Sequence, residues 1–228
     1  MPPLPTLQPS AIPHPNVTDV TGVVLAGGQG LRLGGADKGL QLLHGEPLAR
    51  IVLRRLARQT GRVAINANRN LERYRALLPE VCPEVWPDDG FDPLAPVHAG
   101  PLAGLLTALR RSPTPWVQLV ACDTPFFPAD LVARLRGALA DGPDDAGLAI
   151  PATRDAHGAW RHHPTMAQVH TGLHDALAAY LAGGERKVMR WVETLPHAVV
   201  AFDDAQAFAN LNTRADLDAA AATAHRPD

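Results

Sequence analysis

The sequence has few cysteines, few aromatic residues, no surplus of one charge and no long apolar run. Two cysteines among 228 residues are too few for a disulfide framework, and aromatic residues at 5% disfavour a surface that stacks single-stranded nucleic acid. The 21 basic and 23 acidic residues leave a formal charge of −2, whereas nucleic-acid binders normally have a basic surplus. No run of about 18 apolar residues is present to span a membrane. We therefore expect a cytoplasmic protein that acts on a small molecule, without nucleic-acid or membrane partners.

The residues that are present indicate one folded domain between two tails. Hydrophobic residues make up 46% and charged residues 19%, which is ordinary for a globular chain and excludes wholesale disorder. Six prolines among residues 1–16 predict a disordered or polyproline II tail. We expect a single domain over residues 17–222 and a frayed end over residues 223–228.

Strand and helix patterns alternate along this domain. Short apolar runs predict strands at residues 20–26, 62–66, 84–86, 116–121, 148–151, 165–169 and 198–202. Apolar residues at helical spacing predict helices at residues 47–59, 71–78, 102–109, 128–139, 173–182 and 187–192, and after Asn212. This order predicts an α/β fold with a doubly wound, mostly parallel sheet and helices on both faces.

A glycine-rich segment follows the first predicted strand directly. It reads LAGGQGLRLGGADKG from Leu25 to Gly39, and open α/β sheets bind ligands just beyond such strand ends. Its glycines let main-chain N–H groups approach an anion, and Arg32 and Lys38 add positive charge, so we interpret it as a triphosphate cradle. The segment is not a dinucleotide fingerprint, because Leu33 stands at the third glycine position. It is not a Walker loop either, because Gly39 follows the lysine where serine or threonine is required.

Two polar residues lie at the predicted carboxyl ends of other strands. Asp123 follows the strand at residues 116–121, where a carboxylate is well placed to hold Mg²⁺ between phosphate oxygens and water. An N-cap or turn aspartate before Pro125 is the alternative interpretation. Asn66 closes the second strand and offers both a donor and an acceptor to a base or a ribose.

The spacing LAGG-x3-R-L-GG-x-DKGL closely resembles the loop of molybdenum cofactor guanylyltransferases, within the nucleotidyltransferase superfamily of Rossmann-like fold. The resemblance extends in the family's order from about residue 19 to residue 217. It includes the blocks GEPL at 45–48, INANR at 65–69, GPLAG at 100–104, CDTPF at 122–126, HPT at 163–165, GERKV at 184–188 and FANLNT at 208–213. It implies a Mg²⁺-dependent transfer of GMP from GTP to the terminal phosphate of molybdopterin, with release of pyrophosphate. Because that phosphate is already an anion, we expect no general base.

The resemblance also implies roles for individual residues. It places the nucleotide among Leu25, Ala26, Gly27, Gly28, Lys38, Asn66, Asp88 and Asp123, and the metal at Asp123. Arg32 and Lys38 are candidates for balancing phosphate charge, with a structural salt bridge as the alternative for each, and with Asp123 they form the expected catalytic set. Asn210 and Asn212 are expected on the molybdopterin side, with a helix cap as the alternative for Asn212. Asp89 is an alternative to Asp88, because the two residues are adjacent.

Other interpretations stay open or are set aside at this stage. A related transferase that uses CTP or charges a sugar phosphate is one alternative, and a non-catalytic adaptor that delivers cofactor is another. Apo-molybdoenzymes and other cofactor-biosynthesis proteins are candidate partners. His170 and His174 are four residues apart but lack the glutamate of a zinc motif, so we expect no metal there. Cys122 has no clear activating base, and we expect a packed thiol rather than a nucleophile.

Overall fold

The computed structural model describes residues 17–26, 37–77, 79, 83–88, 100–142 and 146–223. The cradle residues Gly27, Gly28 and Arg32 lie outside these ranges, and so do Asp89 and the predicted tail at residues 1–16. Within the described ranges, every helix is too short or too polar to cross a lipid bilayer.

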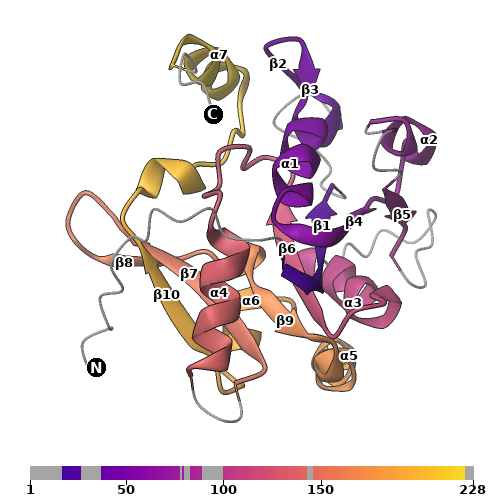
Figure 1. The fold of residues 1–228 in the computed structure, drawn as a ribbon, viewed down its shortest axis with the longest axis vertical. Helices are drawn as coiled ribbons and strands as arrows, with labels where there is room; N and C mark the ends of the chain where they lie inside the picture. Colours follow the sequence, from indigo (N-terminus) through magenta and orange to yellow (C-terminus); the bar gives the residue numbers. More distant parts are fainter. Residues whose placement is uncertain are drawn as a thin grey trace.

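A mixed, mostly parallel sheet of eight strands forms the centre of the domain (Figure 1). The strands are β1 (Val17–Leu25), β4 (Thr60–Asn66), β5 (Glu84–Trp86), β6 (Trp116–Ala121), β7 (Leu148–Arg154), β8 (Trp160–His162), β9 (Gln168–His170) and β10 (Ala198–Phe202). Their order is β10-β7-β9-β6-β1-β4-β5, with β8 paired to β7. Strands β6, β1, β4 and β5 pair in parallel, whereas β9 runs antiparallel to both of its neighbours. The predicted fold class is confirmed.

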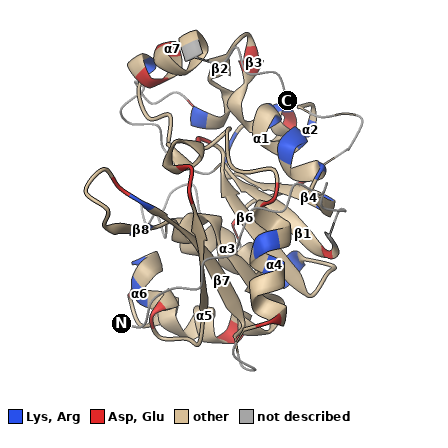
Figure 2. Ribbon diagram, turned by 60° about the vertical axis from the view of Figure 1, so that its left-hand side comes forward, with Lys and Arg blue, Asp and Glu red and all other residues tan. Residues whose placement is uncertain are grey.

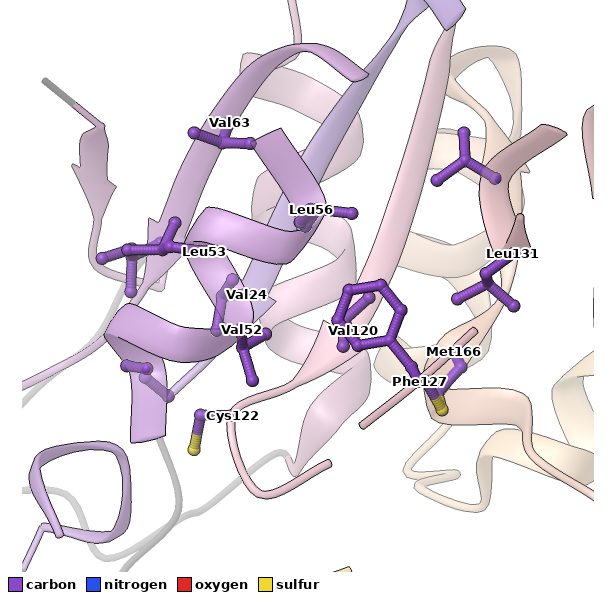
Figure 3. Close-up of a cluster of buried hydrophobic side chains, with 14 of the residues drawn as sticks. Val24, Val52, Leu53, Leu56, Val63, Val120, Cys122, Phe127, Leu131 and Met166 are labelled. Carbon is purple, nitrogen blue, oxygen red and sulfur yellow. The ribbon is translucent and has the colours of Figure 1, made fainter. Parts of the chain in front are cut away.

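Helices cover both faces of this sheet, as the alternating pattern predicts. The helices are α1 (Leu48–Ala57), α2 (Leu71–Arg75), α3 (Pro101–Arg111), α4 (Leu131–Ala140), α5 (His174–Ala182), α6 (Val188–Val192) and α7 (Arg214–Thr223). Because side chains alternate along a strand, Val24 of β1 packs in the core with α1 and α4, and Val23 packs in the core with α3, α5 and α6. The first of these cores is drawn in Figure 3, where Val52, Leu56 and Leu131 converge on the sheet.

Charged residues are spread over several helices and loops of the described chain and include both signs (Figure 2). Along α1, Arg50 and Arg54 both pair with Glu46, and Arg55 donates to the carbonyl oxygen of Phe127. These arginines are therefore engaged within the protein.

The main departure from the predicted elements lies at residues 165–169. The prediction placed one strand there, but residues Pro164–Met166 form a 3-10 turn and the strand β9 begins only at Gln168. Met166 N donates to His163 O at 2.9 Å, which closes this turn, so the pairing with β6 and β7 starts only at Gln168. The helix predicted at residues 71–78 is likewise short and ends at Arg75.

A small hairpin that the sequence reading did not anticipate lies before α1. Strands β2 (Leu42–Leu43) and β3 (Glu46–Pro47) pair antiparallel through a two-residue turn, in which His44 and Gly45 have φ angles of 52° and 79°. Positive φ at both positions is the geometry that tight hairpins require. In both views the hairpin lies beside α7 at one end of the molecule (Figures 1 and 2). There Leu43 packs with Leu48, Leu211 and Leu217, so the hairpin anchors the C-terminal segment.

Candidate active site

The carboxyl ends of four parallel strands meet at one edge of the sheet. The register pairs Leu25 of β1 with Asn66 of β4 and with Ala121 of β6, and it pairs Asn66 with Trp86 of β5. One more main-chain bond extends this alignment, because Ala26 N donates to Asn66 O at 2.8 Å. The residues that follow these strand ends therefore lie near one another, at the edge where open α/β sheets bind ligands.

Lys38 joins two distant segments of the chain at this edge. Its ammonium group donates to Asp123 Oδ2, and to Asn212 Oδ1 at 2.5 Å. The main chain supports the same contact, since Leu211 N donates to Asp123 O at 2.9 Å. The side chains of Lys38 and Asp123 are only 17% and 10% exposed, so water screens their charges weakly. The structure thus brings together three predicted site residues from the beginning, middle and end of the domain.

Asp123 lies in a tight turn after β6. Thr124 N donates to Ala121 O at 3.2 Å, which closes the turn, and α4 begins only at Leu131. Asp123 therefore caps none of the described helices, although it does lie in a turn, and its carboxylate contacts Lys38 at the sheet edge. The Thr124 hydroxyl, which has one proton to donate, lies 3.4 Å from Asp123 Oδ1 and 3.3 Å from Asn210 Oδ1, which adds Asn210 to the group.

The cap of α7 is formed by residues next to Asn212 rather than by its side chain. Asp216 Oδ2 accepts hydrogen bonds from the main-chain N–H groups of Asn212 and Thr213, at 2.8 and 2.7 Å, and Thr213 Oγ1 accepts from Asp216 N at 3.1 Å. This is a capping box, and its hydrogen bonds lower the pKa of the Asp216 carboxyl. The helix-cap alternative for the Asn212 side chain is wrong, because that side chain accepts from Lys38 instead.

A second acidic group lies at the ends of β4 and β5. Asn66 Nδ2 donates to Trp86 O at 3.0 Å and to Asp88 Oδ1 at 2.8 Å. Asn68 Nδ2 donates to Asp88 Oδ2 at 2.9 Å, and Asn68 Oδ1 accepts from Asp88 N at 2.8 Å. Both oxygens of the Asp88 carboxylate are thus fixed by neutral amides. Asp88 and Asn66, which the resemblance placed at the nucleotide, lie in direct contact.

A third, buried carboxylate was missed by the sequence reading. Asp37 accepts a hydrogen bond from the Tyr74 hydroxyl at Oδ1 and another from Asn70 Nδ2 at Oδ2, at 2.8 Å. Arg69 Nε lies 3.5 Å from the same Oδ2. Burial raises the pKa of Tyr74, and the nearby thiol of Cys122 and carboxylate of Asp37 raise it further, so the phenol keeps its proton and donates it. The only sequence signal was the density of polar residues in DKG and NANRN.

The thiol beside Asp123 packs in the interior. Cys122 is 5% exposed and belongs to the core shown in Figure 3. Burial, reinforced by the negative charge of Asp123, raises the pKa of its thiol far above the usual range. A thiol held in its protonated form is a poor nucleophile, in agreement with the prediction of a packed side chain.

His170 and His174 are each held by a different local contact. His170 Nδ1 accepts from Gly172 N at 3.1 Å, and His174 Nδ1 lies 3.0 Å from Thr171 O, so the two rings have separate local partners. His163 stacks on Phe208 with ring centroids 4.6 Å apart. Burial, together with the nearby charges of Arg161 and His162, lowers the pKa of His163 to about 4.

Asp123 is the residue at the sheet edge whose fit to a metal ion can be examined. Among the described residues, no cluster of three or more histidine, cysteine, aspartate or glutamate side chains could bind an ion by itself. Mg²⁺ is commonly held by one or two carboxylates together with phosphate oxygens and water. A single buried carboxylate, with the oxygens of Asn212, Asn210 and Thr124 nearby, therefore fits Mg²⁺ that arrives with a phosphate ligand.

Residues 22–199 match the model of the MobA-like NTP transferase domain. The chain belongs to this family. It is 46% identical over 200 residues to the molybdenum cofactor guanylyltransferase of Cupriavidus necator, covering 87% of this chain and 94% of that protein. It is 47% identical over 216 residues to the protein of the same name in Acidovorax ebreus, covering 91% and 98%. These relatives identify the chain as a nucleotidyltransferase of the MobA-like family.

Solved structures of other MobA-like and related transferases share the fold. Molybdopterin-guanine dinucleotide biosynthesis protein A from Archaeoglobus fulgidus superposes with a TM-score of 0.66 at 22% identity, covering 89% of this chain and 97% of that one. The 4-diphosphocytidyl-2C-methyl-D-erythritol synthase of Anaerococcus prevotii gives a TM-score of 0.67 at 15% identity, covering 90% and 98%. At these identities the likeness establishes the fold of the MobA-like domain and nothing about its substrate.

Proposed function

We propose that the protein transfers GMP from GTP to the terminal phosphate of molybdopterin, which forms the guanine dinucleotide cofactor and releases pyrophosphate. Relatives named molybdenum cofactor guanylyltransferase, 46–47% identical over most of the chain, support this substrate pair. The observation in the structure that supports it best is the contact of Lys38 with both Asp123 and Asn212 at the carboxyl edge of the sheet.

The reaction is a displacement at the α-phosphorus of GTP. A phosphate oxygen of molybdopterin forms a bond to that phosphorus, and the bond from phosphorus to the bridging oxygen of the β-phosphate breaks. The attacking phosphate is an anion at neutral pH, so the protein needs to align the reactants and balance charge rather than remove a proton. The polar groups around Asp123 suit this task, since they are a lysine, asparagines and a threonine.

Lys38 supplies the positive charge for the phosphates in this proposal. Lys38 begins the 3-10 turn Lys38–Leu40 near the end of the glycine-rich segment, and its ammonium group lies against Asp123 and Asn212. We propose that Arg32, which lies outside the described residues, adds a second charge to the same phosphates. Asp123 would hold Mg²⁺, and the bound ion would neutralise phosphate oxygens as charge moves to the departing pyrophosphate.

The nucleoside and the second substrate are assigned to opposite sides of Asp123. We place the base and ribose of GTP beside Asn66 and Asp88, where carboxylate oxygens can accept the N–H groups of guanine or the ribose hydroxyls. The main chain of Leu25 and Ala26, with Gly27 and Gly28, would line the phosphates. Molybdopterin would contact Asn210 and Asn212, which approach Asp123 from the C-terminal segment.

The compartment and the further partners belong to the same proposal. We propose that the enzyme works in the cytoplasm, in keeping with the buried free thiol of Cys122, and that apo-molybdoenzymes or other cofactor-biosynthesis proteins receive its product.

The decisive experiment measures pyrophosphate release with molybdopterin, Mg²⁺ and each of the four ribonucleoside triphosphates in turn. We expect GTP to be preferred at least about 100-fold in kcat/KM, which corresponds to about 2.7 kcal/mol of discrimination. A preference for CTP would replace the guanylyl proposal by a cytidylyl one. Turnover with a sugar phosphate but not with molybdopterin would change the second substrate, and tight GTP binding without turnover would indicate an adaptor.

A further inference from the structure

The segment from Asn66, the last residue of β4, to Asn70, just before α2, carries side chains that contact carboxylates on two sides. We call these residues the 66–70 turn. Asn66 ends β4, and Asn70 precedes α2 with a φ angle of 53°, in the left-handed region that asparagine tolerates better than most residues. The main chain of the turn is tied to both neighbouring strands, through Ala26 N to Asn66 O at 2.8 Å and Ala67 N to Trp86 O at 3.1 Å.

On one side, the turn fixes Asp88. Asn68 makes two hydrogen bonds to this residue, one from its amide nitrogen to Oδ2 and one from Asp88 N to its amide oxygen. Asn66 uses its amide nitrogen for Asp88 Oδ1 and Trp86 O, so both of its amide hydrogens are engaged within the protein. The two asparagines thus hold the Asp88 carboxylate in one orientation.

On the other side, the turn fixes Asp37, the residue before Lys38. Asn70 donates to Asp37 Oδ2 at 2.8 Å, and the Tyr74 hydroxyl donates to Oδ1. Asp37 is 8% exposed, so a carboxylate placed there needs these partners. The Asp37 carbonyl in turn accepts from Leu40 N at 3.2 Å, which closes the 3-10 turn that starts with Lys38.

We propose that the 66–70 turn aligns the two halves of the nucleotide site, with Asn68 as a positioning residue for Asp88 and Asn70 as a positioning residue, through Asp37, for Lys38. This inference rests on the proposed nucleotide site. It goes beyond that proposal because it gives neighbouring asparagines separable effects. Asn68 acts on the nucleoside, which is common to GTP and GMP, and Asn70 acts on the phosphates that only GTP has.

The test compares Asn68→Ala with Asn70→Gly, which removes the amide of Asn70 and keeps a residue suited to positive φ. Binding of GTP and GMP is measured by calorimetry in the presence of Mg²⁺. Asn68→Ala should weaken both ligands about ten-fold, since a hydrogen bond to a charged group is lost. Asn70→Gly should weaken GTP about ten-fold, change GMP less than about two-fold, and lower kcat with saturating substrates.

A double-mutant cycle tests whether Asn68 acts through Asp88. Adding Asn68→Ala to Asp88→Asn should weaken GTP by less than about two-fold, because the partner through which Asn68 acts is already altered. Glu72→Gln is the control, because Glu72 is an exposed residue of α2 that pairs with Arg75. The Glu72→Gln variant should bind GTP and GMP as tightly as the parent protein. A thermal melt checks that Asn68→Ala is folded. If it shows no unfolding transition, Asn68→Ser replaces this variant.

Equal losses for GTP and GMP in Asn70→Gly, or wild-type binding in either variant, would overturn the proposal. The outcome is separable from that of the proposed function. If the parent protein binds CTP more tightly than GTP, the guanylyl assignment fails, and the same variants tested with CTP and CMP still decide whether the 66–70 turn positions both halves of the site.

Discussion

Asp123 and Asp88 both follow parallel strands at the same edge of the sheet, yet their surroundings differ. Asp123 pairs with the ammonium group of Lys38, which compensates its charge. Asp88 is held by the neutral amides of Asn66 and Asn68, which orient its oxygens without cancelling the charge. The comparison teaches that one residue type at equivalent strand ends is adapted to different tasks by its partners. In the proposed site, Asp123 would hold the cation while its partner Lys38 faces the phosphates, and Asp88 would accept the neutral donors of a base or sugar.

The strongest way to break this comparison is Asp123→Asn, which keeps the shape of the side chain and removes its charge. We expect kcat to fall about 1,000-fold or more, because the metal ion loses its negatively charged ligand. The fold should persist, since Lys38 keeps its contact with Asn212. Pyrophosphate release measures kcat, and a thermal melt checks folding. A loss below about ten-fold in a folded variant would remove Asp123 from the centre of the reaction.

The matching change at the other carboxylate, Asp88→Asn, should act mainly on nucleotide affinity. The new amide group would place its nitrogen against the amide nitrogen of Asn66 or Asn68, so one hydrogen bond is lost and two donors face each other. We expect KM for GTP to rise about ten- to thirty-fold while kcat changes less than about three-fold. Steady-state kinetics with saturating molybdopterin give both values. A drop confined to kcat would assign Asp88 to the chemical step instead.

Two glycine substitutions sharpen the account of the nucleoside side. A Cβ at Gly104 of α3 would lie 2.3 Å from Asn66 Oδ1, whereas a Cβ at Gly137 of α4 would meet nothing within 4 Å. Gly104→Ala should therefore displace Asn66, raise KM for GTP about five-fold and destabilise the fold by about 1–2 kcal/mol. Gly137→Ala is its control and should stabilise the fold by up to about 1 kcal/mol through helix propensity, with unchanged kinetics. Denaturant unfolding and GTP titration compare the pair, and a neutral Gly104→Ala would contradict the described contact.

The smallest expected effect is a pH dependence of the free energy of unfolding, caused by His163 between β8 and β9. The pKa of His163 is about 4 in the fold, so between about pH 6.5 and pH 4 the unfolded chain binds a proton that the folded protein does not. The free energy of unfolding should therefore fall as the pH drops through this window, by about 1 kcal/mol because the ring is only partly buried. His163→Gln should lose this part of the pH dependence. Urea unfolding at pH 7 and pH 4.5 gives the free energy of unfolding of the parent protein and of His163→Gln. The same change between the two pH values in both proteins would contradict the assignment.

The sequence predicted the long elements well because their patterns are strong. The apolar, β-branched runs of β1 and β6 are typical of buried strands. The amphipathic spacing at residues 47–59 is typical of a helix and matches α1. Short elements depend on tertiary contacts and were harder to predict. The hairpin of β2 and β3 has two residues in each strand, and β8 has three, too few for a periodic pattern.

The candidate site was predictable where the chain order alone decides the position. Asn66 ends one strand and Asp123 follows another, so their places at the sheet edge could be derived from the predicted parallel fold. Contacts between side chains were harder to predict from the sequence. The bonds from Asn68 to Asp88 and from Asn70 to Asp37 join residues 20 and 33 positions apart, and nothing in the local pattern distinguishes these asparagines from turn residues.

By itself, the amino-acid order determined the α/β fold, the glycine-rich segment after β1 and the acidic residue after β6, because apolar periodicity and strand ends are local properties of a chain. Only the tertiary structure decided that Lys38 joins Asp123 to Asn212, and that one short turn serves two carboxylates. Such contacts arise when the sheet brings distant segments to one edge, where burial makes each polar group depend on a partner.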